Sequence, residues 1–204
     1  MSETNDARSI RFYFSFRSPY AWLAAERLDA ELGTLPVAIE LLPIYPPPDH
    51  VLTNLAAMPQ KILYIAQDIG RLAREQGLTV RFPPLADPDW SLPHAAFLHA
   101  QQYGGGRAFM LEMFRKRFAE GLDLGDDAVI GDAARAAHVD PTAVVCAAHS
   151  GELRSAVSAG WGRGVERDGI FGVPSFVYAG KLYWGQDRMH FLRGAVMRKS
   201  GAGS

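Results

Sequence analysis

The chain has 204 residues, of which 48% are hydrophobic and 21% are charged, so it is long enough to bury one core or a core with an inserted subdomain. Its 21 Lys and Arg residues nearly balance 22 Asp and Glu residues, which argues against nucleic acid or a membrane surface as a partner. The single cysteine, Cys146, excludes an intrachain disulfide, and the six scattered histidines predict no metal site. A polar N-terminus and the absence of a long apolar run predict a cytoplasmic protein.

The chain starts with the pattern of a β-α-β unit. Residues 10–16 combine β-formers with partial alternation, and from Pro19 the apolar residues take helical spacing up to Gly33, a usual helix stop. The short apolar run 37–44 fits a buried second strand that pairs in parallel with the first. A sheet with a crossover helix is therefore predicted.

The character changes after three prolines at 46–48, and the next hundred or so residues read as helices separated by turns. Apolar residues share one helical face in 62–73 and another in 110–118. Three glycines between 160 and 164 predict a weakened or broken helix. The middle of the chain is thus predicted to be helical.

Strand character returns near the end of the chain. Residues 175–178 and 181–184, joined by the turn 179–180, read as a β-hairpin, and a closing helix is expected over 187–198. The order β-α-β, helices, β-β-α matches an α/β thioredoxin-like fold with a helical subdomain inserted between its halves.

This order also predicts the division into domains. We expect residues 1–46 and 169–200 to form the thioredoxin-like domain. Residues 47–168 are expected to form the inserted helical subdomain.

The stretch FSFRSPYAWLA, residues 14–24, places a hydroxyl where the first strand meets the first helix. Ser18 occupies the N-cap and Pro19 the first turn, so free N–H groups and the positive end of the helix dipole favour an anion there. In a redox enzyme of this fold that anion is a cysteine thiolate. Here Ser18 is not acidic enough to ionise and Ala21 offers no second sulfur, so the anion would be the thiolate of a bound cofactor. The alternative is that Ser18 only caps the helix, worth about 1 kcal/mol.

A second stretch, GIFGVPSF, puts a proline directly before the hairpin. Taken alone, the bond before Pro174 is expected to be trans, because cis bonds are only about 5–6% of X-Pro bonds. Together, FSFRSPYAWLA and GIFGVPSFVYAGKLYWGQDRMHFL resemble the kappa-class glutathione transferase and 2-hydroxychromene-2-carboxylate isomerase family, a relative of DsbA-type oxidoreductases. The resemblance covers nearly the whole chain and includes MPQKILYIAQDI in the helical middle.

The resemblance implies that glutathione is the cofactor. Ser18 falls on the family's active-site serine, and Val173, before a Pro174 implied to be cis, would pair its backbone with the cysteinyl unit. The segment that would hold the γ-glutamyl end comprises Trp184, Gly185, Gln186 and Asp187. The residues alone leave other roles open: a core aromatic for Trp184, a solvated loop residue for Gln186 and a helix cap for Asp187.

Two residues are implied on the substrate side. Asn54 is the candidate for a family asparagine near the first inserted helix. Lys61 matches a family lysine that would meet an acidic substrate or the glycyl carboxylate of glutathione, and its alternative is a solvated helix lysine.

The function implied by the resemblance is a homodimeric, glutathione-dependent isomerase of aromatic catabolism. Such an enzyme would act on a small aromatic pyruvate-type substrate by reversible addition of a thiolate. A kappa-like glutathione transferase and a non-catalytic glutathione- or thiol-binding module are the alternatives.

Cys146, in an apolar stretch, is predicted to be buried, and His94 and His99 are predicted to have structural roles.

Overall fold

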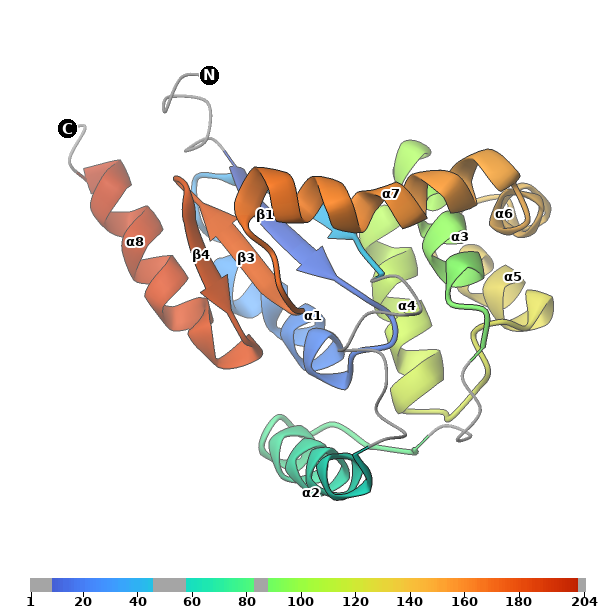
Figure 1. Cartoon of the computed structure of the whole chain (residues 1–204), viewed down its shortest axis with the longest axis horizontal. Coiled ribbons are helices and arrows are strands. Elements are labelled where there is room, and N and C mark those ends of the chain that lie inside the picture. The colour runs from blue at the N-terminus through green and yellow to red at the C-terminus, as the bar shows by residue number, and fades with distance from the viewer. Residues whose placement is uncertain (1–8, 46–57, 83–87, 202–204) are drawn as a thin grey trace.

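The computed structural model describes residues 9–45, 58–82 and 88–201. A four-stranded sheet with the strand order β2-β1-β3-β4 lies at its centre (Figure 1). β1 pairs in parallel with β2 and antiparallel with β3, and β3 pairs antiparallel with β4. The strands are β1 Ser9–Phe14, β2 Ala38–Pro43, β3 Ser175–Tyr178 and β4 Lys181–Trp184.

The helices follow the predicted order, which confirms the thioredoxin-like fold with helices between its β-α-β and β-β-α halves. In chain order they are α1 Pro19–Leu32, α2 Pro59–Glu75, α3 Ser91–Gln102, α4 Gly106–Phe118, α5 Asp127–Ala136, α6 Pro141–Ala148, α7 Gly151–Asp168, the 3-10 helix η2 Gln186–Arg188 and α8 Met189–Gly201. None of these helices is long and apolar enough to cross a membrane. The domain boundaries stay a prediction.

The two faces of the sheet are covered unequally. On one face Phe12 stacks on Phe176, with ring centroids 4.7 Å apart, in a large core shared with α1, α4 and α8. On the other face Tyr13 and Val177 belong to a smaller apolar cluster against which Trp161 of α7 packs. Strand alternation sends neighbouring residues to these two cores, and the larger core joins both halves of the chain.

The glycines of α7 do not break this helix, so the break offered in the prediction of a weakened or broken helix is wrong. α7 runs without interruption from Gly151 to Asp168 and ends at Gly169, whose φ of +66° is the left-handed conformation of a helix C-cap. A side chain at Gly164 would come within 3.2 Å of the Tyr13 ring. At Gly164 the missing side chain lets α7 lie close to the sheet, which offsets its poor helix propensity.

Cys146 is exposed on α6, which corrects the prediction that it is buried. The buried residues of α6 are Val144, Ala147 and Ala148, at the spacing of one helical face. Cys146 lies off that face, so an apolar sequence run did not predict burial in a helix.

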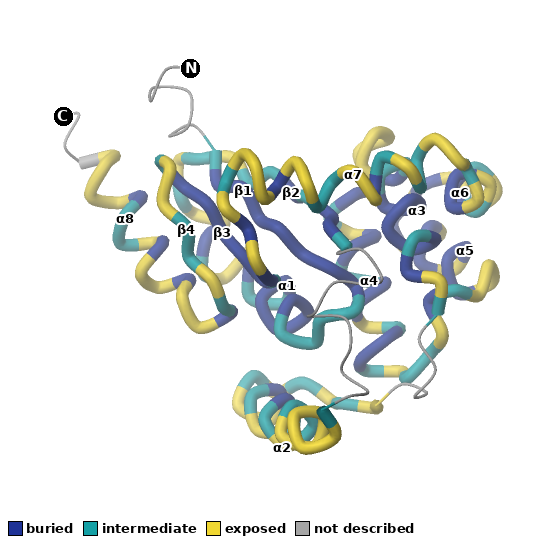
Figure 2. The backbone as a smooth tube through the Cα atoms, in the orientation of Figure 1, coloured by how far each residue is buried: buried dark blue, intermediate teal, exposed yellow. Residues whose placement is uncertain are grey.

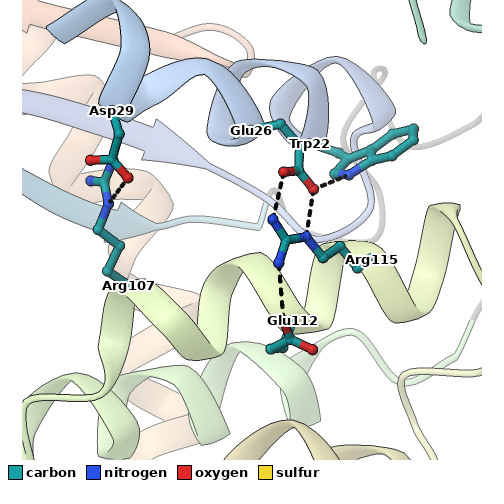
Figure 3. Close-up of polar contacts among 6 residues, drawn as sticks. All are labelled: Trp22, Glu26, Asp29, Arg107, Glu112 and Arg115. Carbon is teal, nitrogen blue, oxygen red and sulfur yellow. Dashed lines mark hydrogen bonds and ion pairs between the residues drawn. The ribbon is translucent and has the colours of Figure 1, made fainter. Parts of the chain in front are cut away.

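α1 and α4 are joined by ion pairs, which connect the thioredoxin-like half to the inserted helices (Figure 3). The Glu26 carboxylate accepts from Arg115 Nε and Nη2, both at 2.9 Å, and from Trp22 Nε1 at 3.1 Å. One helical turn on, Arg107 Nη2 donates to Asp29 at 2.8 Å.

Glu26→Ala is expected to lower the free energy of unfolding by about 1–3 kcal/mol, because it removes three hydrogen bonds from a carboxylate that is only 10% exposed. Asp29→Ala is the matched control and should cost under about 1 kcal/mol, because that carboxylate is 75% exposed. Urea unfolding measures both. Equal losses of stability in the two variants would contradict the conclusion that Glu26 joins α1 and α4 more strongly than Asp29 does.

Candidate functional site

A cavity of about 300 Å³ lies where the turn after β1, the start of α1 and the loop before β3 meet. It brings together four of the predicted site residues: Ser18, Lys61, Val173 and Trp184. A larger cavity, about 470 Å³, lies between β2 and α7 and is lined by none of the predicted residues. Asn54 lies outside the described residues.

Ser18 caps α1 in an extended conformation, and its hydroxyl oxygen accepts from the Ala21 amide at 3.2 Å. The hydroxyl proton is not used in this bond, so capping the helix and donating to a ligand are compatible. The Tyr20 amide, at the same helix start, makes no hydrogen bond within the described residues. A hydroxyl donor, a free amide and the positive helix end thus stand at the cavity.

The loop before β3 presents an unpaired peptide. The Val173-Pro174 bond is cis, as the resemblance implies and contrary to the expectation from X-Pro frequencies. Gly185 N–H donates to the Pro174 carbonyl at 2.9 Å, and Ser175 Oγ donates to the Gly172 carbonyl at 2.7 Å. The N–H and C=O of Val173 itself have no partner in the part of the chain that the structure describes, which fits pairing with a peptide-like ligand.

The predicted γ-glutamyl segment is only partly at the cavity. Trp184 lines it and is 53% exposed, so it is not a core aromatic. Gln186 is buried, not solvated, and its Oε1 accepts from Arg27 of α1 at 2.9 Å. Asp187 is exposed and pairs with Arg188 at 2.8 Å. Gly185, Gln186 and Asp187, like Pro174, are not lining residues, so their binding roles stay predictions.

Among the described residues, two cationic side chains line the cavity, and most of the other lining residues are apolar or aromatic. Arg17 and Lys61 line it, and no carboxylate does so among the described residues. Lys61 is exposed and makes no ion pair within the described ranges. This charge suits a ligand that carries carboxylates.

Four aromatic residues of the wall were missed by the sequence analysis: Tyr20, Tyr45, Trp161 and Phe171. Phe171 stands inside the GIFGVPSF stretch, next to the predicted Val173, and its ring centroid is 5.0 Å from that of Trp184. Trp161 lies between two glycines of α7, and an isolated large aromatic there was the available signal.

Gly172 admits the Trp184 side chain to the cavity wall. A Cβ at Gly172 would lie 2.8 Å from Trp184 Nε1 and 3.4 Å from Cε2, so the indole occupies the place of a side chain. Gly172 is needed here for close approach, not for a left-handed φ.

Gly172→Ala is therefore expected to displace the indole, shift the tryptophan emission and weaken the predicted binding of glutathione as much as Trp184→Ala would. Gly162→Ala is the matched control, because a Cβ there meets nothing within 4 Å. Fluorescence and calorimetry check the result. An unchanged emission and affinity in Gly172→Ala would contradict the close-approach argument.

His94 supports the turn that carries Ser18. Its Nδ1–H donates to the Trp90 carbonyl at 2.6 Å, and its Nε2 accepts from the Phe16 amide at 3.3 Å. Complete burial lowers the pKa of His94 from 6.5 to about 4. The imidazole is therefore neutral at pH 7 and has a structural role, as expected from its place in the sequence.

The buried His94 predicts a loss of stability in acid. As the pH falls from 6.5 to 4, the unfolded chain binds a proton at His94 that the native imidazole does not bind. The free energy of unfolding therefore decreases, by about 3 kcal/mol in all. Urea unfolding at pH 6.5 and 4.5 measures the fall. His94→Asn, which does not titrate, should be less stable but show a shallower pH dependence. An equal slope in both proteins would contradict this prediction.

Comparison with known proteins identifies the family to which this chain belongs. The sequence profile of the family described as DSBA-like thioredoxin domain matches residues 9–197. The chain belongs to the DSBA-like thioredoxin domain family. The predicted relation to DsbA-type proteins is therefore confirmed.

The relatives of this chain include proteins named 2-hydroxychromene-2-carboxylate isomerase. One from Sphingobium xenophagum is 28% identical over 201 residues, covering 93% of this chain and 98% of the relative. One from Pseudomonas putida is 24% identical over 194 residues, with 93% and 94% covered. The predicted resemblance to these isomerases is confirmed.

Solved structures of similar proteins agree with the fold. A structure of 2-hydroxychromene-2-carboxylate isomerase matches with a TM-score of 0.79 at 21% identity, covering 96% of this chain and 97% of the other. The cytosolic disulfide reductase DsbM from Pseudomonas aeruginosa matches with a TM-score of 0.65 at 21% identity, covering 93% and 98%.

Proposed function

We propose that this protein is a glutathione-dependent isomerase of the 2-hydroxychromene-2-carboxylate isomerase type. The observation that carries the proposal is the Ser18 hydroxyl, at a helix start and in the same cavity as the unpaired Val173 peptide. The names of the Sphingobium and Pseudomonas relatives support the reaction. A structure of the neighbour DsbM is described as being with GSH, which supports the cofactor.

The residues of the cavity fit a γ-glutamyl tripeptide. The free N–H and C=O of Val173 suit its cysteinyl unit, and the positive charge of Arg17 and Lys61 suits its carboxylates. Trp184 would contact the γ-glutamyl end, with Asp187 beside it as the predicted partner of the ammonium. When bound, glutathione supplies a nucleophilic thiol that adds reversibly to a conjugated carbon.

The protein's own contribution is electrostatic and steric. Ser18 donates a hydrogen bond to a thiolate, and the start of α1 adds the helix dipole and the free Tyr20 amide. The aromatic wall of Tyr45, Trp161 and Phe171 offers flat apolar surface to the aromatic substrate and excludes water. The cation of Lys61 fits the substrate's carboxylate. His94, buried and neutral, takes no proton from the substrate.

The test follows the fate of glutathione during turnover of an aromatic 2-oxo acid of the hydroxychromene carboxylate type. An isomerase interconverts the two forms of the substrate, requires glutathione and leaves its concentration unchanged. A kappa-like transferase would consume glutathione and release a conjugate. A non-catalytic module would bind glutathione without turnover. Isomerisation that is independent of glutathione would contradict the proposal.

The sequence does not support the disulfide chemistry of DsbA-type oxidoreductases. That chemistry needs a redox sulfur at the helix start, where this chain has Ser18 and Ala21. The one cysteine, Cys146, is exposed on α6 and does not line the cavity. Reduction of insulin disulfides by the protein alone would overturn this conclusion.

A further inference from the structure

α2 brings two residues to the cavity although the part of the helix that carries them is barely buried. Lys61 and Ile65 line the cavity, whereas the buried residues of α2 are Ile69 and Ala73, farther along. Figure 2 shows that much of α2 is exposed, although Ile69 and Ala73 belong to the main core. Packing alone therefore fixes the position of Lys61 only weakly.

A hydrogen bond ties this part of α2 to the turn that carries Ser18. Tyr20 Oη donates to Asp68 Oδ2 at 2.9 Å, in a partly buried contact between α1 and α2. Burial and this hydrogen bond raise the pKa of Tyr20, so its hydroxyl remains a donor. Asp68 lies seven residues after Lys61 and three after Ile65, on the same side of the helix.

The two ends of this hydrogen bond have different surroundings. Tyr20 lines the cavity and stands two residues after Ser18. The other carboxylate oxygen of Asp68, Oδ1, faces Arg71 at 4.0 Å, on the exposed side of α2. The bond from Tyr20 is therefore the polar contact of Asp68 that reaches the site.

We propose that Tyr20 and Asp68 are positioning residues, which hold α2 so that the ammonium of Lys61 binds a carboxylate of the ligand. The proposal rests on the proposed function and deepens it. The carboxylate belongs either to the glycyl end of glutathione or to the aromatic substrate. In both cases Tyr20 and Asp68 act only through Lys61.

The test is a double-mutant cycle on ligand affinity, measured by calorimetry. Tyr20→Phe, Asp68→Asn and Lys61→Met should each weaken binding about 3- to 10-fold. Combined with Lys61→Met, neither of the other two changes should weaken it further. Tyr64→Phe is the matched control, an exposed tyrosine of the same helix, and should bind like wild type.

Two ligands distinguish the source of the carboxylate. If it is glycyl, the effects appear with glutathione and vanish with glutathione amide. If it belongs to the substrate, glutathione binds all variants equally, and the effects appear with benzylidenepyruvate in the presence of S-methylglutathione. Losses for Tyr20→Phe that persist undiminished in the Lys61→Met background, or no loss with either ligand, would overturn the proposal.

The failure of this inference differs from failure of the proposed function. In the first case wild type binds glutathione and its ultraviolet absorbance reports a thiolate, but the cycle shows no coupling to Lys61. In the second case wild type itself binds no glutathione, and both proposals fall together.

Discussion

Ser18→Ala is expected to raise the pKa of a bound glutathione thiol by about 1–2 units, because a hydrogen bond to a charged group contributes about 1.5–3 kcal/mol. The variant would then bind glutathione largely as the neutral thiol at pH 7. Turnover should fall about 10- to 100-fold, since the thiolate fraction falls with it. Ultraviolet difference absorbance against pH measures the thiol pKa, and steady-state kinetics measures turnover.

The control separates this effect from loss of the helix cap. Ser18→Ala also removes the hydrogen bond from the Ala21 amide, which costs about 1 kcal/mol of stability. Ser18→Thr keeps both a cap and a hydroxyl donor, so it should retain thiolate formation if its methyl group is accommodated. A folded Ser18→Ala protein with an unchanged thiol pKa would contradict the role given to the hydroxyl.

Asp168→Ala is expected to lower the free energy of unfolding by about 3–5 kcal/mol, because it removes the buried carboxylate that accepts from Nε and Nη2 of the buried Arg11. Asp168 accepts from Arg11 Nε and Nη2, both at 2.7 Å, and the two side chains are 4% and 2% exposed. Tyr13 Oη also donates to it at 2.5 Å. Urea unfolding measures the loss.

This pair also holds the end of α7 against β1. The loop that carries Val173 starts directly after Asp168, so the variant should bind glutathione more weakly as well. Tyr13→Phe removes only one of the three donors to this carboxylate and should cost about 1.5–3 kcal/mol. Replacing both partners, with Arg11→Met and Asp168→Leu, should destabilise less than Asp168→Ala alone. A loss in Asp168→Ala no larger than that in Tyr13→Phe would contradict the account.

Local patterns predicted the elements well where they carried a strong signal. The hairpin strands at 175–178 and 181–184 match the structure residue for residue, because a turn with a glycine separates two short runs of β-formers. The break predicted at the glycines of α7 was wrong, because helix propensity does not reveal a close approach between helix and sheet. The predicted burial of Cys146 was also wrong, because an apolar composition does not reveal which residues lie on the buried face of a helix.

The candidate site was predictable where it follows one motif and not where it needs tertiary structure. Ser18 could be singled out from the local chemistry of a helix start, and Val173 from a resemblance. Trp161 lies outside both motifs and is brought to the cavity by α7, and its only local signal is that it is a large aromatic between two glycines. The Tyr20–Asp68 hydrogen bond likewise joins residues 48 positions apart.

The central claim is that this cavity binds glutathione as a thiolate, and titration of the wild-type protein with glutathione tests it most directly. Calorimetry gives the stoichiometry and affinity, and the ultraviolet difference absorbance reports ionisation of the thiol at pH 7. S-methylglutathione is the control, since it lacks the ionisable thiol. The account predicts one glutathione per chain, bound with a thiolate signal that the control lacks. Absence of binding, or binding without that signal, would contradict it.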